Sequence, residues 1–186
     1  MTIAEKLKTV AENEQKVYNA GRGAGAEMIA KRVNGTLTEI AAADLVGLTT
    51  IARNALSYLP LTSVTLPNSL TSLGRNCFTY CESLTSIVVP EGVTKIEYGA
   101  LNGCAKLHDI VLPSTLESIE GYALNTGQRS SVVIRIHAST PPTIAADTLQ
   151  ADRLLRIVVP DGCGAAYKGA TNWSVYADKI LEEGEA

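Results

Sequence analysis

The residues best suited to acid–base or nucleophilic chemistry are few in this sequence. His108 and His137 are the only histidines among the 186 residues. Each falls in or beside a segment with the pattern of a β-strand, and neither has a serine, cysteine or carboxylate at a spacing typical of a catalytic group. The pattern therefore predicts two histidines on the outer faces of strands, without a catalytic role.

Carboxylates and glycines give no stronger indication of an active site. Four carboxylates lie where stacked repeats could bring them together: Asp109, Glu117, Glu120 and Asp147. Glycoside hydrolysis also needs a cleft, which a narrow ribbon of repeats does not offer. The segment GRGAG at residues 21–25 lacks the full spacing of a dinucleotide loop and follows a helical pattern instead of a strand. We interpret it as a flexible joint, and we expect no enzyme activity and no cofactor.

The cysteines have no spacing typical of a metal site. They are Cys77, Cys81, Cys104 and Cys163, with no CxxC pair and no histidine at zinc-site spacing, so we expect no bound metal. Cys81 and Cys104 are one repeat apart, and stacked coils would bring their Cα atoms to about 5 Å, within disulfide range. Because the chain shows no export signal, we interpret both as reduced, buried residues. A disulfide formed in an oxidising compartment is the alternative.

A leucine-rich unit of 23 residues organises the chain around these groups. Units start at Leu61, Leu84 and Leu107. Further apolar residues and prolines fall in fixed columns: Val64, Ile87 and Ile110; Pro67, Pro90 and Pro113; Leu73, Ile96 and Ile119. This self-similarity predicts a repeat solenoid, in which each coil buries its apolar side by stacking on its neighbours. We expect a right-handed leucine-rich repeat solenoid of short parallel strands, turns and short helical turns.

Within a regular coil, residues 84–89 alternate as a β-strand does. Leu84, Ile87 and Val89 would point inward. Ser86 and Val88 would point outward, and a proline would end the strand. A second extended piece is expected at residues 94–96, and a tight helical turn at residues 97–103.

The outward strand positions form a candidate ligand-binding stripe. Its members, coil by coil, are Ser63 and Thr65, Ser86 and Val88, Asp109 and Val111, Arg135 and His137, and Arg156 and Val158. A rigid, extended face of this kind binds a partner at low entropic cost. A solvated sheet face, whose residues simply favour β structure, explains the same pattern.

The two ends of the repeat array have different patterns. The first coil, from Gly35, is degenerate, as expected of a terminal unit. The last strand is followed by an aromatic cluster, which predicts a cap at about residues 160–182: Tyr167, Trp173, Tyr176 and Ile180. We therefore predict a repeat domain with its cap at residues 35–186, preceded by a helix and Gly-rich linker at residues 1–34.

The predicted N-terminal helix, residues 2–20, is amphipathic. Its apolar stripe consists of Ile3, Leu7, Val10 and Val17. Two interpretations remain open. The helix packs on its own repeats, or it forms a short parallel bundle that makes a homo-oligomer.

Composition excludes several classes of partner. A net charge of -3 and a pI near 5.4 leave no basic footprint for nucleic acid. No run of residues approaches the length of a membrane span, and the amino terminus lacks the apolar core of a signal peptide. We therefore expect no nucleic-acid partner and no membrane insertion.

The repeat columns, above all LTSIVVPEGVTKIEYGALNGC, resemble the BspA-type (Treponema pallidum type) leucine-rich repeat family over roughly residues 36–180. The ending is similar to a terminal segment found in such proteins of gut Firmicutes and Bacteroidetes. This resemblance implies a non-enzymatic adhesion or interaction module that binds a protein or a cell-surface glycan.

The opening MTIAEKLKTVAENEQKVYNAG resembles the segment that precedes such repeats in phage and prophage proteins of Firmicutes. It implies a tail-associated protein of the virion that contacts the host surface or assembles on the tail. The alternatives are an interaction module or inhibitor of a host protein in the bacterial cytoplasm, and a fragment of a bacterial surface adhesin.

Overall fold

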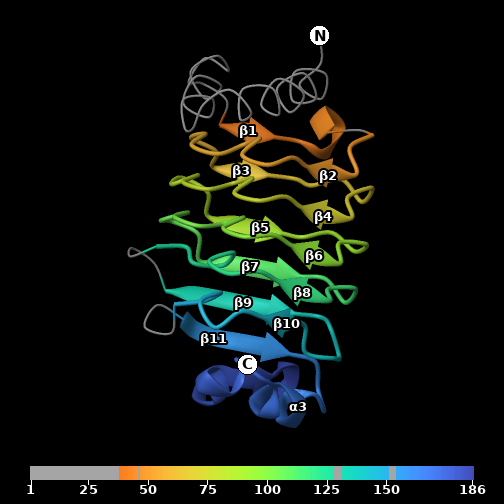
Figure 1. Cartoon of the computed structure of the whole chain (residues 1–186), viewed down its shortest axis with the longest axis vertical. Coiled ribbons are helices and arrows are strands. Elements are labelled where there is room, and N and C mark those ends of the chain that lie inside the picture. Colours follow the sequence, from red (N-terminus) through yellow and green to blue (C-terminus); the bar gives the residue numbers. More distant parts are fainter. Residues whose placement is uncertain (1–37, 46, 128–130, 151–153) are drawn as a thin grey trace.

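A computed structural model describes residues 38–45, 47–127, 131–150 and 154–186 of the chain. The helix and linker predicted for residues 1–34, including the stripe from Ile3 to Val17, lie outside the described residues. The described chain winds through successive coils that stack along its long axis, from orange at one end to blue at the other (Figure 1).

One side of the stack is a parallel sheet with the strand order β12-β11-β9-β7-β5. The strands are β5 (Ser86–Val88), β7 (Asp109–Leu112), β9 (Val132–Ile136), β11 (Leu154–Val159) and β12 (Ile180–Glu182). Two shorter strands, β1 (Glu39–Ile40) and β3 (Ser63–Val64), pair in parallel and precede β5 along the stack (Figure 1). We call the outer side of these strands the outer strand face.

A second side is a parallel sheet with the order β10-β8-β6-β4-β2. Its strands have two residues each: β2 (Thr50–Ile51), β4 (Ser72–Leu73), β6 (Lys95–Ile96), β8 (Ser118–Ile119) and β10 (Thr143–Ile144). The two rows of strands run side by side down the stack (Figure 1). The prediction of a leucine-rich repeat with short parallel strands is confirmed.

Helices are short in the described part of the chain. The first coil contains η1 (Ala42–Leu45). The C-terminal region contains α3 (Gly164–Gly169), η2 (Ser174–Lys179) and η3 (Glu183–Glu185).

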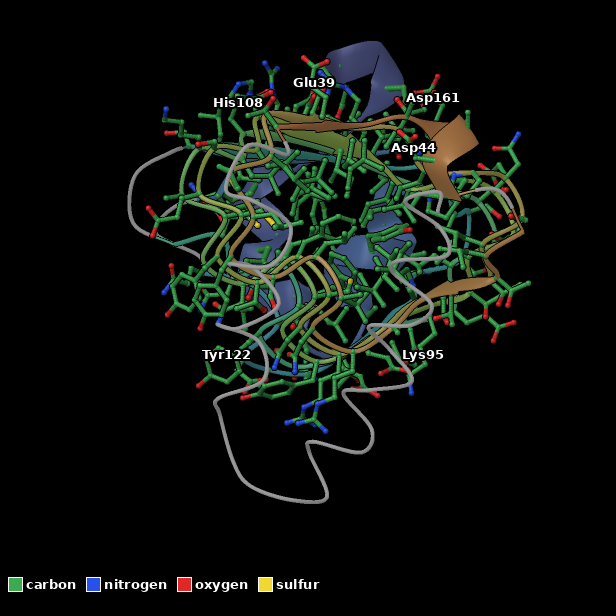
Figure 2. The ribbon with its side chains drawn as sticks, turned by 90° about the horizontal axis from the view of Figure 1, so that it is seen from above. Glu39, Asp44, Lys95, His108, Tyr122 and Asp161 are labelled. Carbon is green, nitrogen blue, oxygen red and sulfur yellow. The ribbon has the colours of Figure 1, made fainter. Side chains whose placement is uncertain are left out.

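The core lies between the walls of the stack, where side chains fill the interior (Figure 2). Ile87 lies opposite Ile110, and Ile110 lies opposite Ile134, so the predicted apolar columns form continuous ladders. All three side chains are buried. The fixed period of apolar residues produces this core because parallel coils in register place equivalent residues directly above one another.

The cysteines of the repeats belong to this core as free thiols. The Cys81 thiol donates to the Leu56 carbonyl at 3.0 Å, and the Cys104 thiol donates to the Phe78 carbonyl at 3.1 Å. Each thiol thus satisfies a buried carbonyl in the preceding coil. Burial raises the pKa of Cys104 to about 12, which keeps its thiol protonated at neutral pH. The reduced state of both cysteines in solution stays a prediction.

The third side of the stack differs from the prediction of helical turns. The segment 97–103 forms turns whose alternate N–H groups donate to the next coil: Gly99 to Gly121, Leu101 to Ala123 and Gly103 to Asn125, at 2.8–3.0 Å. In the same ladder, N–H groups of residues 54–58 donate to carbonyls of residues 75–79, and N–H groups of residues 76–80 donate to carbonyls of residues 98–102. Left-handed residues within each segment interrupt helical geometry and turn alternate N–H groups toward the neighbouring coil.

The aromatic side chains of the predicted cap pack together beside the last coil. Trp173 and Tyr167 are buried, with their rings edge to face at a centroid distance of 5.3 Å. The Trp173 indole N–H donates to the Pro142 carbonyl and the Tyr167 hydroxyl donates to the Ala138 carbonyl, both at 2.7 Å. These side chains therefore cover the last coil and satisfy carbonyls that no further coil would meet.

The pairing of the fourth strand corrects one predicted alignment. We expected Arg135 and His137 to correspond to Asp109 and Val111, but Arg135 lies opposite Val111, and Val133 lies opposite Asp109. Because side chains alternate along a strand, this shift of two residues leaves Arg135 and His137 on the outer side, where both are exposed. The expected alignment implied 26 residues from Asp109 to its equivalent, whereas the observed coil, from Ile110 to Ile134, has 24.

Candidate interaction surface

The turns of the third side place tyrosines where the backbone favours glycine. Tyr58, Tyr80 and Tyr122 have φ angles of 62°, 57° and 57°, in the left-handed region. Glycine enters this region without a steric penalty, whereas a bulky residue does so only at a cost. In the next coil, Gly103 occupies the position equivalent to Tyr58 and Tyr80, with a φ of 72°.

Tyr58 and Tyr80 form an exposed aromatic stack. Their ring centroids are 5.2 Å apart and their planes differ by 21°. The two residues are 54% and 43% exposed, although both are large and partly apolar. The Tyr80 ring lies against Gly103, where a Cβ atom would come within 2.6 Å of the ring. The glycine therefore provides the space that the last ring of the stack occupies.

A second aromatic pair lies on the same side, in the two coils that follow Tyr80. The Tyr98 and Tyr122 rings are 5.5 Å apart and tilted by 54°. The Arg75 guanidinium lies 4.4 Å from the centre of the Tyr98 ring, in cation–π geometry. Tyr122 is 39% exposed and stands at the periphery of the stack, away from Lys95 and His108 (Figure 2). We call the side chains of Tyr58, Tyr80, Tyr98, Tyr122 and Arg75 the tyrosine surface.

Carboxylates from neighbouring coils hold the backbone of this surface. Glu97 accepts the N–H of Arg75, and Glu120 accepts the N–H of Tyr98, both at 2.9 Å. The Lys95 ammonium lies 2.7 Å from the Glu120 carboxylate. This ammonium is the main reason that the pKa of Glu120 is lowered, and the N–H of Tyr98 contributes. The backbone at Arg75 and Tyr98 is therefore hydrogen-bonded to carboxylates of the next coil.

The outer strand face differs from its prediction in how far its members are exposed. Its predicted members Ser63, Thr65, Ser86, Val88 and Arg135 are exposed. Three others are half-buried: Asp109, Val111 and Arg156. Val158, also expected to face solvent, is only 6% exposed.

The outer strand face carries an ion pair and an exposed valine. Arg135 makes an ion pair with Asp109 across neighbouring strands. Val88 is 60% exposed, the highest value for a large apolar residue of this face.

The residues first considered for chemistry are not brought together. His137 lies 3.9 Å from the Glu91 carboxylate, and His108 is exposed elsewhere on the outer strand face. Of the four carboxylates, Asp109 pairs with Arg135 and Glu120 pairs with Lys95. Within the described ranges, no group of three or more His, Cys, Asp or Glu residues is arranged to hold a metal ion.

Sequence reasoning missed the tyrosine surface. We expected outward residues only on the strands, and we interpreted residues 97–103 as a helical turn. A signal was present, because Tyr58 and Tyr80 are 22 residues apart and lie outside the leucine columns. Near-period spacing of large residues outside the core columns indicates a surface ladder.

The fold defines the protein as a leucine-rich repeat protein. A comparison with family models matches the BspA type leucine-rich repeat region, in six copies, to residues 35–162. The chain belongs to this family. Repeats of this class typically act as non-enzymatic modules that mediate protein binding, so the match indicates a protein-interaction module.

A search of curated proteins finds no match to this chain. Where the structure describes the chain, no helix is long and apolar enough to cross a membrane.

Proposed function

We propose that the chain is a protein-interaction module whose stacked coils act as a rigid solenoid and present the tyrosine surface to a partner protein. The observation that carries this proposal is the exposed stack of Tyr58 and Tyr80 on left-handed backbone. No catalytic step enters the proposal.

The energetic argument rests on the backbone. A non-glycine residue in the left-handed region costs about 1–2 kcal/mol. Stacking of two aromatic rings returns about 0.5–1.5 kcal/mol, shared between both residues. Gly103 meets the same backbone requirement in the next coil without this cost. Stability alone therefore gives no reason for tyrosine at residues 58 and 80, whereas contact with a partner does.

The chemistry of the side chains suits a protein partner. Tyrosine and arginine are enriched among residues that dominate binding energy, and a tyrosine ring loses little entropy when it is immobilised. No hydrogen bond to a described residue engages the hydroxyl groups of Tyr58, Tyr80 or Tyr122. Each can therefore bond to a partner while its ring buries apolar area.

A peptide selection tests the proposal without a known partner. Peptides are selected from a random library on the full chain, and their affinities are then measured by calorimetry. Against the variant Tyr58→Gly/Tyr80→Gly, most selected peptides should lose about tenfold or more in affinity. The matched control is Val175→Ser, which removes an exposed apolar side chain from the cap and should leave affinity unchanged.

The outer strand face stays a second proposed binding surface. The same selection shows which of the two surfaces binds the peptides. Peptides that bind the tyrosine double variant at full strength but lose affinity for Val88→Ser would contradict the tyrosine surface. They would support the stripe that runs from Ser63 to Arg156.

We further propose that residues 1–34 tether or oligomerise the module, in a phage or prophage tail. The support is the resemblance of the opening segment and its apolar stripe: Ile3, Leu7, Val10 and Val17. Oligomerisation would add avidity to weak contacts at each surface.

Mass by light scattering, for the full chain and for a chain starting at Gly35, tests this assembly. An oligomer that becomes a monomer on truncation is expected. A monomer in both cases would contradict the tether and favour a single-site intracellular module or inhibitor.

A further inference from the structure

Strand β11 contains an extra residue next to an arginine. Leu154 lies opposite Val132 and Arg156 lies opposite Val133, so Leu155 has no partner across the pair. Leu155 forms the bulge and is 55% exposed. Bulges re-aim side chains and are common beside binding sites.

The bulge determines the side on which Arg156 emerges. Without it, Leu155 would lie opposite Val133, and Arg156 would lie opposite the inward-facing Ile134. With the bulge, Arg156 shares the outer side with Arg135, two residues along from its own partner Val133. With a strand spacing of about 4.8 Å and a rise of about 3.3 Å per residue, such neighbours lie about 8 Å apart, within reach of long side chains.

The two arginines border a hollow at the C-terminal end of the outer strand face. The hollow has a volume of about 390 Å³ and is lined by Arg135, Arg156, Val158, Glu183 and Ala186. Val158 gives it an apolar part, and Glu183 places a carboxylate at the lining. The hollow therefore combines a hydrophobic contact with groups of both charges.

The two arginines of the hollow differ in whether they have a partner. Arg135 is paired with Asp109. Arg156 makes no ion pair or hydrogen bond through its guanidinium with any residue in the described part of the chain. A guanidinium presents a planar fork of donors that matches a carboxylate in two parallel hydrogen bonds. Arg156 therefore lines the hollow with donors that no described residue engages.

We propose that this hollow binds the carboxylate of an acidic side chain in an extended segment of a partner protein. Arg156 provides the fork and Arg135 the second positive charge. Leu155, which is exposed beside Arg156, offers apolar surface to the residues that flank the acidic one. Glu183 opposes a compact dianion such as phosphate, which lacks apolar flanks to compensate for the repulsion. The site goes beyond the tyrosine surface and does not depend on it.

Nuclear magnetic resonance of the isotopically labelled full chain tests the site. The probe is a blocked peptide of alternating valine and glutamate, with its glutamine counterpart and inorganic phosphate as separate titrations. The glutamate peptide should shift the side-chain signals of Arg156 and Arg135 in a saturable way that weakens with salt. The affinities of the glutamine peptide and of phosphate should be lower than that of the glutamate peptide by a factor of about ten or more.

Variants identify the residue responsible. Arg156→Gln should weaken the glutamate peptide about tenfold or more. The control Lys106→Gln, which removes an exposed positive charge elsewhere, should not. Arg156→Lys keeps the charge but loses the fork, so it should give an intermediate affinity, and it serves as the test if the glutamine variant fails to fold.

Three outcomes would overturn the proposal: equal binding of the glutamine peptide, tighter binding of phosphate than of the peptide, or unchanged affinity in both Arg156 variants. The variant Tyr58→Gly/Tyr80→Gly should retain the glutamate peptide. The experiment therefore distinguishes an error in the proposal for the hollow from an error in the proposal for the tyrosine surface.

Discussion

Aromatic side chains gather in two regions of this molecule, and the two regions use them differently. In the C-terminal cap, Trp173 and Tyr167 are buried and their polar atoms donate to carbonyls of the last coil. On the tyrosine surface, Tyr58 and Tyr80 are exposed, and no described residue bonds to their hydroxyl groups. The cap aromatics therefore complete the fold, whereas the surface aromatics leave contact area open to a partner.

The difference shows that burial and polar bonding distinguish the two roles better than residue type does. A buried indole N–H or phenol hydroxyl must find an acceptor, and the last coil offers carbonyls that no further coil would satisfy. An exposed tyrosine on left-handed backbone has no such structural reason. Substitutions in the two regions should consequently have opposite effects on folding and on binding.

The largest expected effect is at the centre of the cap. Trp173→Ala removes a buried ring and the donor to Pro142, so it should lower the free energy of unfolding by about 3–5 kcal/mol. Equilibrium urea unfolding, followed by far-ultraviolet circular dichroism, measures the change. A loss below about 1 kcal/mol would mean that the cap does not hold the last coil.

The next effect lies beneath the tyrosine stack. Gly103→Ala places a Cβ on left-handed backbone and within 2.6 Å of the Tyr80 ring. Unfolding free energy should fall by about 1–2 kcal/mol, and the near-ultraviolet signal of the stacked tyrosines should change. Gly169→Ala is a suitable control, because no heavy atom lies within 4 Å of a Cβ at that residue. Equal stability of the Gly103 variant and the wild type would contradict the tight contact.

Alkaline pH should weaken the cap through Tyr167. Burial raises the pKa of this phenol above its ordinary value of about 10. The folded state therefore keeps its proton where the unfolded state loses it, so the contribution is complete below about pH 10 and is lost as the pH rises further. The loss is about 1.4 kcal/mol per pH unit.

The variant Tyr167→Phe isolates this contribution, because every other titrating group stays in place. Its unfolding free energy should fall less steeply with pH above about pH 10 than that of the wild type. Parallel curves for the two proteins would show that Tyr167 does not retain its proton in the folded state.

The repeat core could be predicted from the sequence because each coil obeys one local rule. Ile87, Ile110 and Ile134 lie in one ladder since parallel coils in register superimpose equivalent residues. The aromatic cap followed from the same logic, because an open end of such a stack needs apolar cover. Both features depend on spacing and residue type, which the sequence contains.

The tyrosine surface and the arginine hollow could not be predicted in this way. The exposure of Tyr58 and Tyr80 depends on left-handed backbone in turns that we interpreted as helical. The outward direction of Arg156 depends on a bulge at Leu155, which arises from strand pairing and has no local sequence signal. Backbone geometry that varies from coil to coil therefore limits what the period alone predicts.

The smallest expected effect on stability accompanies the largest effect on binding. In Tyr58→Gly/Tyr80→Gly, release of left-handed strain offsets the lost stacking and the greater freedom of the unfolded chain. The free energy of unfolding should change by less than about 1 kcal/mol, as expected from the glycine already present at residue 103.

The central claim is tested most directly by measuring unfolding free energy and peptide affinity on this one double variant. Our account predicts near-normal stability together with an affinity loss of about tenfold or more for peptides selected on the wild type. A double variant that binds as well as the wild type, or one that loses binding only because it unfolds, would contradict it.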